Sequence, residues 1–90
     1  MDIEFDPAKR EKTLLERGLD FADAPQIFVG RYLTMEDLRE PYPEPRFITV
    51  GGLGGRMVVL VWTTRGTARR IISMRKANDR EVARYTAALG

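Results

Sequence analysis

The most strongly patterned stretch of the chain is MVVLVWT, residues 57–63, in which the first six residues are all apolar. Most of these residues are β-branched or aromatic, which favours a strand, and a run without polar alternation is typical of a strand covered on both faces. We therefore predict that this stretch is a central strand of a sheet, with protein on each side of it.

Two further strands flank this stretch. FITV (47–50) precedes it, with a turn at the glycine-rich residues 51–55, and a second turn at 65–67 leads into ARRIISMRK (68–76). The three strands are predicted to form an antiparallel meander. Period-two alternation divides the last strand into two faces, Arg69, Ile71, Ser73 and Arg75 on one and Arg70, Ile72, Met74 and Lys76 on the other. We expect the second set to face the core, so that Arg69 and Arg75 point outward.

The N-terminal half carries signals for a short strand and two helices. Residues 3–5 alternate apolar with polar, and Asp6 followed by Pro7 suits the first turn of a helix that would end near Gly18. A second helix is predicted from Asp23 to about residue 28, since proline is tolerated only in a first turn. Residues 31–35 are expected to be extended, and residues 40–45 to form a proline-rich loop.

The C-terminal residues predict a closing helix. Asn78 and Glu81 have the spacing of a capping box, in which each side chain bonds the other's backbone N–H. Val82, Tyr85 and Leu89 then fall on one helical face, which we expect to pack against the sheet. Trp62 and Tyr85 are accordingly predicted to be core residues rather than platforms for stacked bases.

Length and composition fit one α+β domain over residues 1–90, since 43% of the residues are hydrophobic and 31% are charged. The chain has neither cysteine nor histidine, and no run of spaced acids resembles a calcium loop, so we expect no metal and no cofactor. The acidic first residues lack the pattern of a signal peptide, and residues 57–62 are too few to span a bilayer. A cytoplasmic protein without membrane contact is expected.

Charge is distributed unevenly along the chain. Residues 1–45 carry six Lys/Arg against eleven Asp/Glu, a net of −5, whereas residues 46–90 carry nine against two, a net of +7. A basic half of this kind attracts phosphate backbones. Alternatively, the two halves pair with each other as ordinary surface ion pairs. The charges by themselves favour neither interpretation.

Five phrases of the chain occur in the order seen in one toxin family. They are EFDPAK (4–9), RGLDF (17–21), RFITVG (46–51), TTRG (63–66) and RIISMRKA (70–77). With Glu81 and Tyr85 they cover almost the whole chain, which resembles the BrnT toxins. The resemblance implies a RelE-like fold: a short N-terminal strand, two helices, a central antiparallel sheet and a C-terminal helix.

The resemblance also implies a function. BrnT-like proteins are endoribonuclease toxins of type II toxin–antitoxin pairs that inhibit translation by cutting RNA, and a BrnA-type antitoxin with a ribbon-helix-helix domain neutralises them. We expect a hetero-oligomer with such an antitoxin, RNA as the substrate, and contact with operator DNA only through the antitoxin. Metal-independent cleavage would then use cations to stabilise the phosphorane charge.

Candidate site residues follow from the basic strand, its preceding turn and the family pattern. Lys9, Arg65 and Arg75 are the predicted catalytic residues, of which Lys9 matches the family's lysine and is the candidate for proton transfer or charge stabilisation. The predicted RNA-binding residues are Arg17, Arg69, Lys76 and Arg80. Arg69 and Arg75 could instead form a solvated strand face paired with acids of the N-terminal half, and Lys9 could be a surface residue of its helix paired with Asp6 or Glu11.

One departure from the family pattern opens a second hypothesis. Where BrnT toxins typically carry Lys-His-Gly, this chain reads Glu16-Arg17-Gly18. A chain without that histidine could be a catalytically weakened member that acts mainly as antitoxin partner and transcriptional co-repressor. A third hypothesis is a small interaction domain whose charge asymmetry serves assembly alone.

Overall fold

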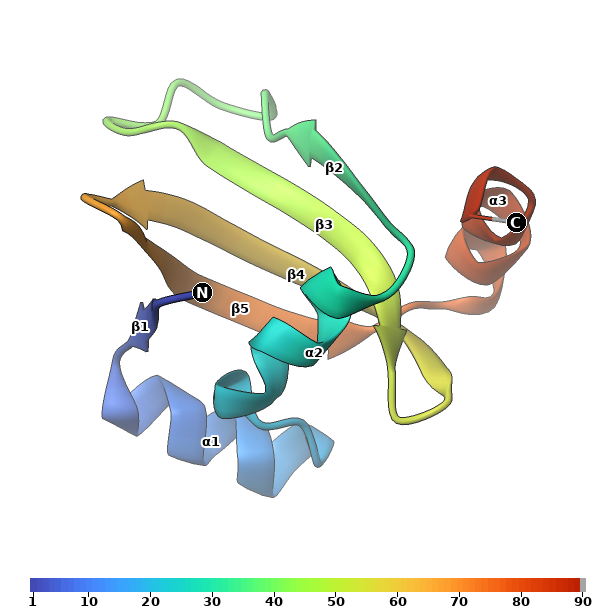
Figure 1. Cartoon of the computed structure of the whole chain (residues 1–90), viewed down its shortest axis with the longest axis horizontal. Helices are drawn as coiled ribbons and strands as arrows, with labels where there is room; N and C mark the ends of the chain where they lie inside the picture. The colour runs from blue at the N-terminus through green and yellow to red at the C-terminus, as the bar shows by residue number, and fades with distance from the viewer. Residues whose placement is uncertain (90) are drawn as a thin grey trace.

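The computed structural model describes residues 1–89 and contains a five-stranded sheet with helices before and after it (Figure 1). The elements in chain order are β1 (Ile3–Phe5), α1 (Pro7–Arg17), the 3-10 turn η1 (Phe21–Asp23), α2 (Ala24–Val29), β2 (Tyr32–Glu36), β3 (Arg46–Leu53), β4 (Arg56–Arg65), β5 (Ala68–Lys76) and α3 (Asp79–Leu89). The α+β class is therefore confirmed.

The sheet has the strand order β1-β5-β4-β3-β2. β3, β4 and β5 form the antiparallel meander that the sequence predicts. The sheet as a whole is mixed, because β1 pairs in parallel with the first residues of β5 while β2 adds an antiparallel strand beside β3. The extended segment predicted for residues 31–35 is thus an edge strand.

The core lies between one face of the sheet and the segment formed by α1, η1 and α2. Phe21, Ala24 and Ile27 are fully buried there against Leu60 and Met74 of the sheet. Alternate residues of β4 point into this core, and the residues between them are buried on the opposite face as well, since Val59 is only 4% exposed. The prediction of a central strand with protein on both sides is confirmed, and Trp62 is a core residue as expected.

The predicted faces of β5 are wrong in part, because the strand contains an irregularity. Val61 is opposite Ser73 and Trp62 is opposite Ile71, so that Ile72 is an extra residue in the ladder. A bulge of this kind shifts the alternation by one residue. Ile71 and Met74 therefore both face the helices, and Arg69 and Arg75 lie on opposite faces of the sheet rather than together.

Local signals in the sequence fix most element ends. Asp6 accepts a hydrogen bond from the backbone of Ala8, and Gly18 ends α1 in a left-handed conformation at φ 68°. Asp23 is the residue before α2, as predicted, but its side chain makes no capping bond, and the preceding turn is capped by Asp20.

The glycine-rich segment is only partly a turn. Residues 51–53 belong to β3, and the turn itself consists of Gly54 and Gly55, both at positive φ. Gly51 is required for a different reason: a Cβ at this position would lie 2.8 Å from Cγ2 of Ile27. The glycine therefore allows α2 to approach the sheet closely.

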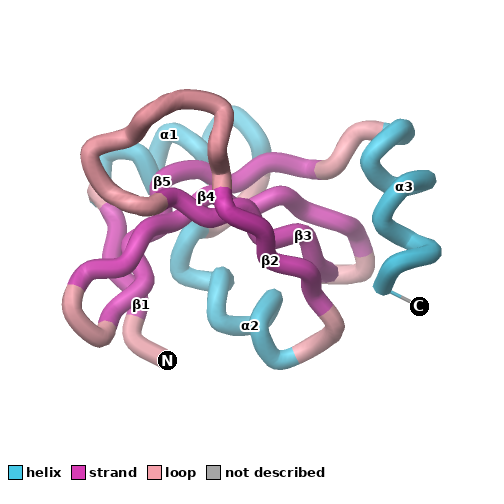
Figure 2. Tube along the Cα trace, turned by 90° about the horizontal axis from the view of Figure 1, so that it is seen from above, coloured by secondary structure: helices cyan, strands magenta, loops and turns pink. Residues whose placement is uncertain are grey.

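The closing helix forms but does not pack as closely as expected. The predicted capping box is present, with Asn78 and Glu81 bonding each other's backbone N–H. α3 has no fully buried residue, Val82 is 39% exposed, and the helix stands apart from α1 and α2 at one end of the sheet (Figure 2). Tyr85 is one contact with the sheet, its hydroxyl 3.9 Å from Sδ of Met35, and Glu81 makes another with Arg75 of β5. Among residues 1–89, no helix has the length and apolar character needed to cross a membrane.

Candidate functional site

The face of the sheet opposite α1 and α2 carries a cleft of about 280 Å³. Its floor consists of aliphatic side chains from β3 and β4, and its rim consists of polar side chains from β5, α3 and the loop after β2. The lining residues are Met35, Arg39, Ile48, Val50, Val59, Val61, Ser73, Arg75, Glu81 and Tyr85. We call this the open-face cleft.

Arg75 is held in the cleft by Glu81. Nη1 and Nη2 of the guanidinium donate to the two carboxylate oxygens at 2.7 and 2.9 Å. The hydrogen bonds from Arg75 lower the pKa of Glu81 to about 2, and the pKa of Arg75 is raised in return. A bidentate carboxylate occupies the same donor fork that a phosphate would use. Arg75 is thus aimed for an oxyanion, and α3 supplies one.

A second guanidinium enters the cleft from the loop after β2. Arg39 donates to both carboxylate oxygens of Asp37, at 2.8 and 2.7 Å. The Asp37 side chain is buried while that of Arg39 is 68% exposed, and the hydrogen bonds from Arg39 lower the pKa of Asp37 to about 2. The ion pair fixes one edge of the Arg39 guanidinium, while much of the Arg39 side chain is exposed to solvent.

The outer edge of β5 is open beyond the residues that β1 covers. β1 ends where Phe5 pairs with Ile71, so the remaining residues of β5 form a free strand edge. Arg17, from the last turn of α1, satisfies part of this edge by donating from Nη1 to the carbonyl of Met74 at 2.9 Å. A hollow of about 180 Å³ lies beside it, and Lys9 and Ser73 are among its lining residues.

Ser73 lines both this hollow and the open-face cleft. The free edge of β5 therefore brings Lys9 and Arg17 to one side and Arg75 to the other. Lys9 forms no ion pair with Asp6 or Glu11.

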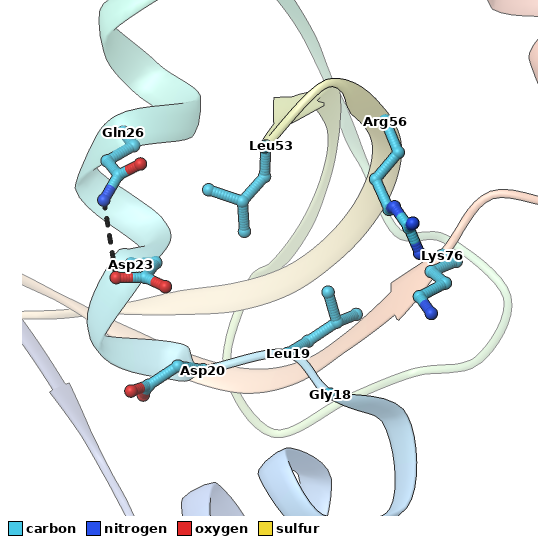
Figure 3. A pocket seen from close by; sticks show the side chains of 9 residues that line it. Gly18, Leu19, Asp20, Asp23, Gln26, Leu53, Arg56 and Lys76 are labelled. Atoms are coloured by element: carbon cyan, nitrogen blue, oxygen red, sulfur yellow. Dashed lines mark hydrogen bonds between the residues drawn. The ribbon is translucent and has the colours of Figure 1, made fainter.

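A third cavity, of about 350 Å³, lies at the same end of β5 on the helix-covered side (Figure 3). Lys76 and Arg56 form one wall of it, and Asp20 and Asp23 lie on the other. Three cation-lined hollows thus surround the last residues of β5.

Two of the predicted site residues lie away from this end. Arg65 ends β4, six residues beyond the position opposite Arg75, which is about 20 Å along the strand. It is 3.8 Å from Glu44. Arg69 lies on the helix-covered face, where its guanidinium stacks on the rings of Phe28 and Trp62 at 4.1 and 4.7 Å. The structure therefore does not bring Arg65 or Arg69 together with Lys9 and Arg75.

Arg80 is an exposed residue of the first turn of α3. Sequence reasoning missed Arg39 altogether and assigned Tyr85 to the core. Arg39 lies in an acidic, proline-rich segment that reads as a solvated loop, so no local pattern marks it. The pair with Asp37 joins residues only two apart, but the position of Arg39 at the cleft appears only once the loop is folded back on the sheet.

Both interpretations of the charge asymmetry describe part of the surface. Ion pairs between the two halves exist, namely Arg65 with Glu44 and Arg70 with Glu4. The cations near the free edge of β5 are different, since Lys9, Arg17 and Lys76 form no ion pair within residues 1–89. This edge therefore carries cations that no carboxylate of the described residues neutralises.

Among residues 1–89, no group of three or more His, Cys, Asp or Glu side chains is placed so that it could hold a metal ion. The carboxylates of the open-face cleft, Asp37 and Glu81, are each occupied by a guanidinium. What the geometry offers is a set of cations and a phenol around an apolar floor, which suits an anionic ligand with an apolar part.

Comparison with known proteins agrees with this chemistry. The family described as "Ribonuclease toxin, BrnT, of type II toxin-antitoxin system" matches residues 5–81, which include strands β2 to β5, the last residue of β1 and the free β5 edge. No individual curated protein matches the chain. Because the match covers most of the sequence, the chain belongs to the BrnT family of ribonuclease toxins of type II toxin–antitoxin systems.

Proposed function

We propose that this protein is an endoribonuclease toxin whose RNA substrate lies across the free edge of β5. The observation that carries the proposal is the meeting of two hollows at Ser73, one with Lys9 and Arg17 and one with Arg75. A phosphodiester at this edge can be contacted from both sides of one strand. The meander with two preceding helices on one face also supports the RelE-like fold that the resemblance implies.

The cleavage step would be an internal displacement at phosphorus. The 2′-oxygen attacks the phosphorus, its proton is removed, and the bond to the 5′-oxygen breaks as that oxygen gains a proton. Arg75 stabilises the charge on the equatorial oxygens, with Arg39 contributing from the opposite rim. Lys9 exchanges the proton or stabilises charge, and the Tyr85 hydroxyl donates a hydrogen bond to a phosphate oxygen.

We propose that this chemistry is independent of metal ions. The candidate residues stabilise charge through guanidinium and ammonium groups, which need no Lewis acid. The two carboxylates in the open-face cleft already bind arginines, and releasing either one for a metal would leave a cation without its partner.

The partner that controls the toxin is proposed to be a BrnA-type ribbon-helix-helix antitoxin. An acidic or amphipathic segment of it would cover the basic edge of β5, so that inhibition and exclusion of RNA coincide. Operator DNA would be contacted only through that partner. The proposed place of action is the cytoplasm, where cleavage of messenger RNA would inhibit translation.

Cleavage of a defined RNA by the purified chain, in buffer with excess chelator, tests the proposal. Arg75→Lys keeps the charge but loses the bidentate fork, and we expect kcat to fall by about 10²-fold or more. Lys9→Ala should also lower kcat. Arg70→Ala removes an equal charge from the other end of β5, where the side chain pairs with Glu4, and is expected to change kcat by less than about twofold. Absence of cleavage by the folded wild-type chain would contradict the proposal.

Arg65→Ala distinguishes a site at the free β5 edge from the site predicted from the sequence, which includes Arg65. If the free β5 edge is the site, Arg65 is too far away to affect the chemical step, and only KM should change. A loss of kcat equal to that of Arg75→Lys would place the reaction elsewhere. Circular dichroism and thermal unfolding of each variant check that the fold is retained.

A second candidate function is supported by Arg17. In place of the family's histidine, this side chain donates to the Met74 carbonyl and so has a structural role at the strand edge. The chain would then act mainly as antitoxin partner and co-repressor. Arg17→His tests this directly: a gain in RNA cleavage supports a weakened toxin, and no gain counts against it.

A further inference from the structure

The cavity shown in Figure 3 combines three kinds of wall within one nucleotide-sized space of about 350 Å³. Arg56 and Lys76 lie on one side, Leu19 and Leu53 form an apolar floor, and Asp23 lies opposite the cations. The cations suit the phosphate of a nucleotide, and the apolar surface suits the flat face of its base. The carboxylate suits an amino group on that base.

We propose that this cavity binds one nucleotide of the RNA and selects bases that carry an amino group. The phosphate binds Arg56 and Lys76, the base lies on the leucines, and Asp23 accepts a hydrogen bond from the amino group. The inference rests on the proposed function, because it takes RNA as the ligand, and it adds a specificity site to it.

The cationic wall is built by strand register. Lys76 is opposite Val58, and Arg56 lies two residues before Val58 on the same face of β4, so the two side chains are diagonal neighbours. Figure 3 shows them side by side at the rim of the cavity. Neither forms an ion pair with a carboxylate of residues 1–89. Two adjacent cations repel each other, and a phosphate between them removes that repulsion.

The apolar floor is available although it belongs to the core. Leu19 is 5% exposed and Leu53 is 9% exposed, and both also line the cavity. Their side chains face each other across it in Figure 3. A base placed here would pack on the two leucines, whose other sides are already covered by the core. This contact does not require an aromatic side chain.

The acidic wall contains a single carboxylate with free acceptor capacity. Asp20 already accepts from Arg10 and from the backbone of Ala22, and it points away from the cavity in Figure 3. Asp23 accepts one long hydrogen bond of 3.4 Å from Gln26. An ionised carboxylate is an acceptor only, so it favours the amino group of cytosine over the carbonyl oxygen that uracil carries at the same place.

The cavity is also placed to receive a neighbour of the cleaved bond. Lys76 follows Arg75 directly, and strand alternation points their side chains to opposite faces of the sheet. An RNA strand that contacts Arg75 in the open-face cleft and bends around the free β5 edge reaches Lys76 next. The selected nucleotide would therefore flank the scissile phosphate.

Two mononucleotides that differ in one functional group give a matched test. Cytidine and uridine 5′-monophosphates are titrated into the ¹⁵N-labelled chain, with inorganic phosphate as a third probe, and amide shifts are followed. We expect shifts at Leu19 and Leu53, and a dissociation constant for the cytidine nucleotide at least about fivefold lower than for the uridine nucleotide. Phosphate alone should bind more weakly than either.

Three variants locate the recognition. Asp23→Asn keeps the size of the side chain and the acceptor for Gln26, and it should abolish the difference between the two nucleotides. Arg56→Ala with Lys76→Ala should weaken both by about tenfold or more. Arg84→Ala, which removes a charge elsewhere, should leave both dissociation constants unchanged.

Several outcomes would overturn the proposal. These are equal affinities for the two nucleotides, shifts that map outside the cavity, and preference retained in Asp23→Asn. The result is separable from the proposed function. A chain that cuts RNA but fails to discriminate the nucleotides loses only the specificity site, whereas one that discriminates them but never cuts RNA retains the site and loses the enzymatic proposal.

Discussion

Glu81→Gln is expected to lower the KM for RNA, because Glu81 occupies the donor fork of Arg75 that a phosphate must use. The substitution removes the charge and leaves the capping box intact, since glutamine accepts the Asn78 N–H as glutamate does. Glu81→Ala removes both contacts and serves as the comparison for any loss of helix stability.

The size of the effect follows from the strength of the pair. The hydrogen bonds from Arg75, and after them the backbone N–H of Asn78, lower the pKa of Glu81 to about 2, so about 3 kcal/mol is the upper limit for the pair with Arg75. Side-chain exposures of 44% for Arg75 and 23% for Glu81 allow solvent to screen the pair, so about 0.5–1 kcal/mol is the appropriate range. RNA no longer has to displace a carboxylate, and KM should fall by about two- to fivefold.

Initial cleavage rates measured against RNA concentration at neutral pH provide the assay. The same KM difference is expected throughout pH 5–8, because a carboxyl with a pKa of about 2 remains ionised over that range in the wild-type chain. A KM that rises in Glu81→Gln while kcat falls would refute the reasoning, since it would show that Glu81 orients Arg75 for catalysis instead of competing with the substrate.

Three further predictions concern stability. The arginine partner of Asp37 lowers the pKa of this carboxyl to about 2. The carboxyl therefore contributes fully to stability above its ordinary pKa, and this contribution is lost as the pH falls toward 2. Asp37→Asn should flatten the acid side of a plot of thermal-unfolding midpoint against pH. Thr49→Val leaves the buried indole N–H of Trp62 without its acceptor at 2.8 Å and should cost about 1–3 kcal/mol in denaturant unfolding. Gly51→Ala forces a Cβ to within 2.8 Å of Ile27 and should cost about 1–3 kcal/mol in the same measurement. A Gly52→Ala control, with open space around the added carbon, should cost less.

Much of the architecture could be predicted from local patterns. Caps at Asp6 and Asn78, the stop at Gly18 and the apolar run of β4 are encoded within a few residues of where they act. These are short-range effects, and their physical causes are visible in the sequence. β2 was expected only as an extended segment, because its own residues do not indicate which strand it pairs with.

The bulge in β5 shows where local reasoning fails. Strict alternation puts Arg69 on the same face as Arg75, and one extra residue at Ile72 places them on opposite faces. Which strand carries a bulge depends on how the two partners fit the twist of the sheet and the side chains packed on it. A single sequence holds no local signal for that fit.

The sequence by itself determined the elements, the basic character of the second half, and membership of a ribonuclease toxin family, because these depend on composition, short-range bonding and linear phrases. The tertiary structure alone decided which cations lie near one another. Lys9, Arg39 and Arg75 are far apart along the chain. Lys9 lies beside the free edge of β5 because β1 is short, and Arg75 faces Arg39 across the open-face cleft because the loop after β2 folds back over the sheet. Side chains converge through the packing of distant segments, which no local pattern records.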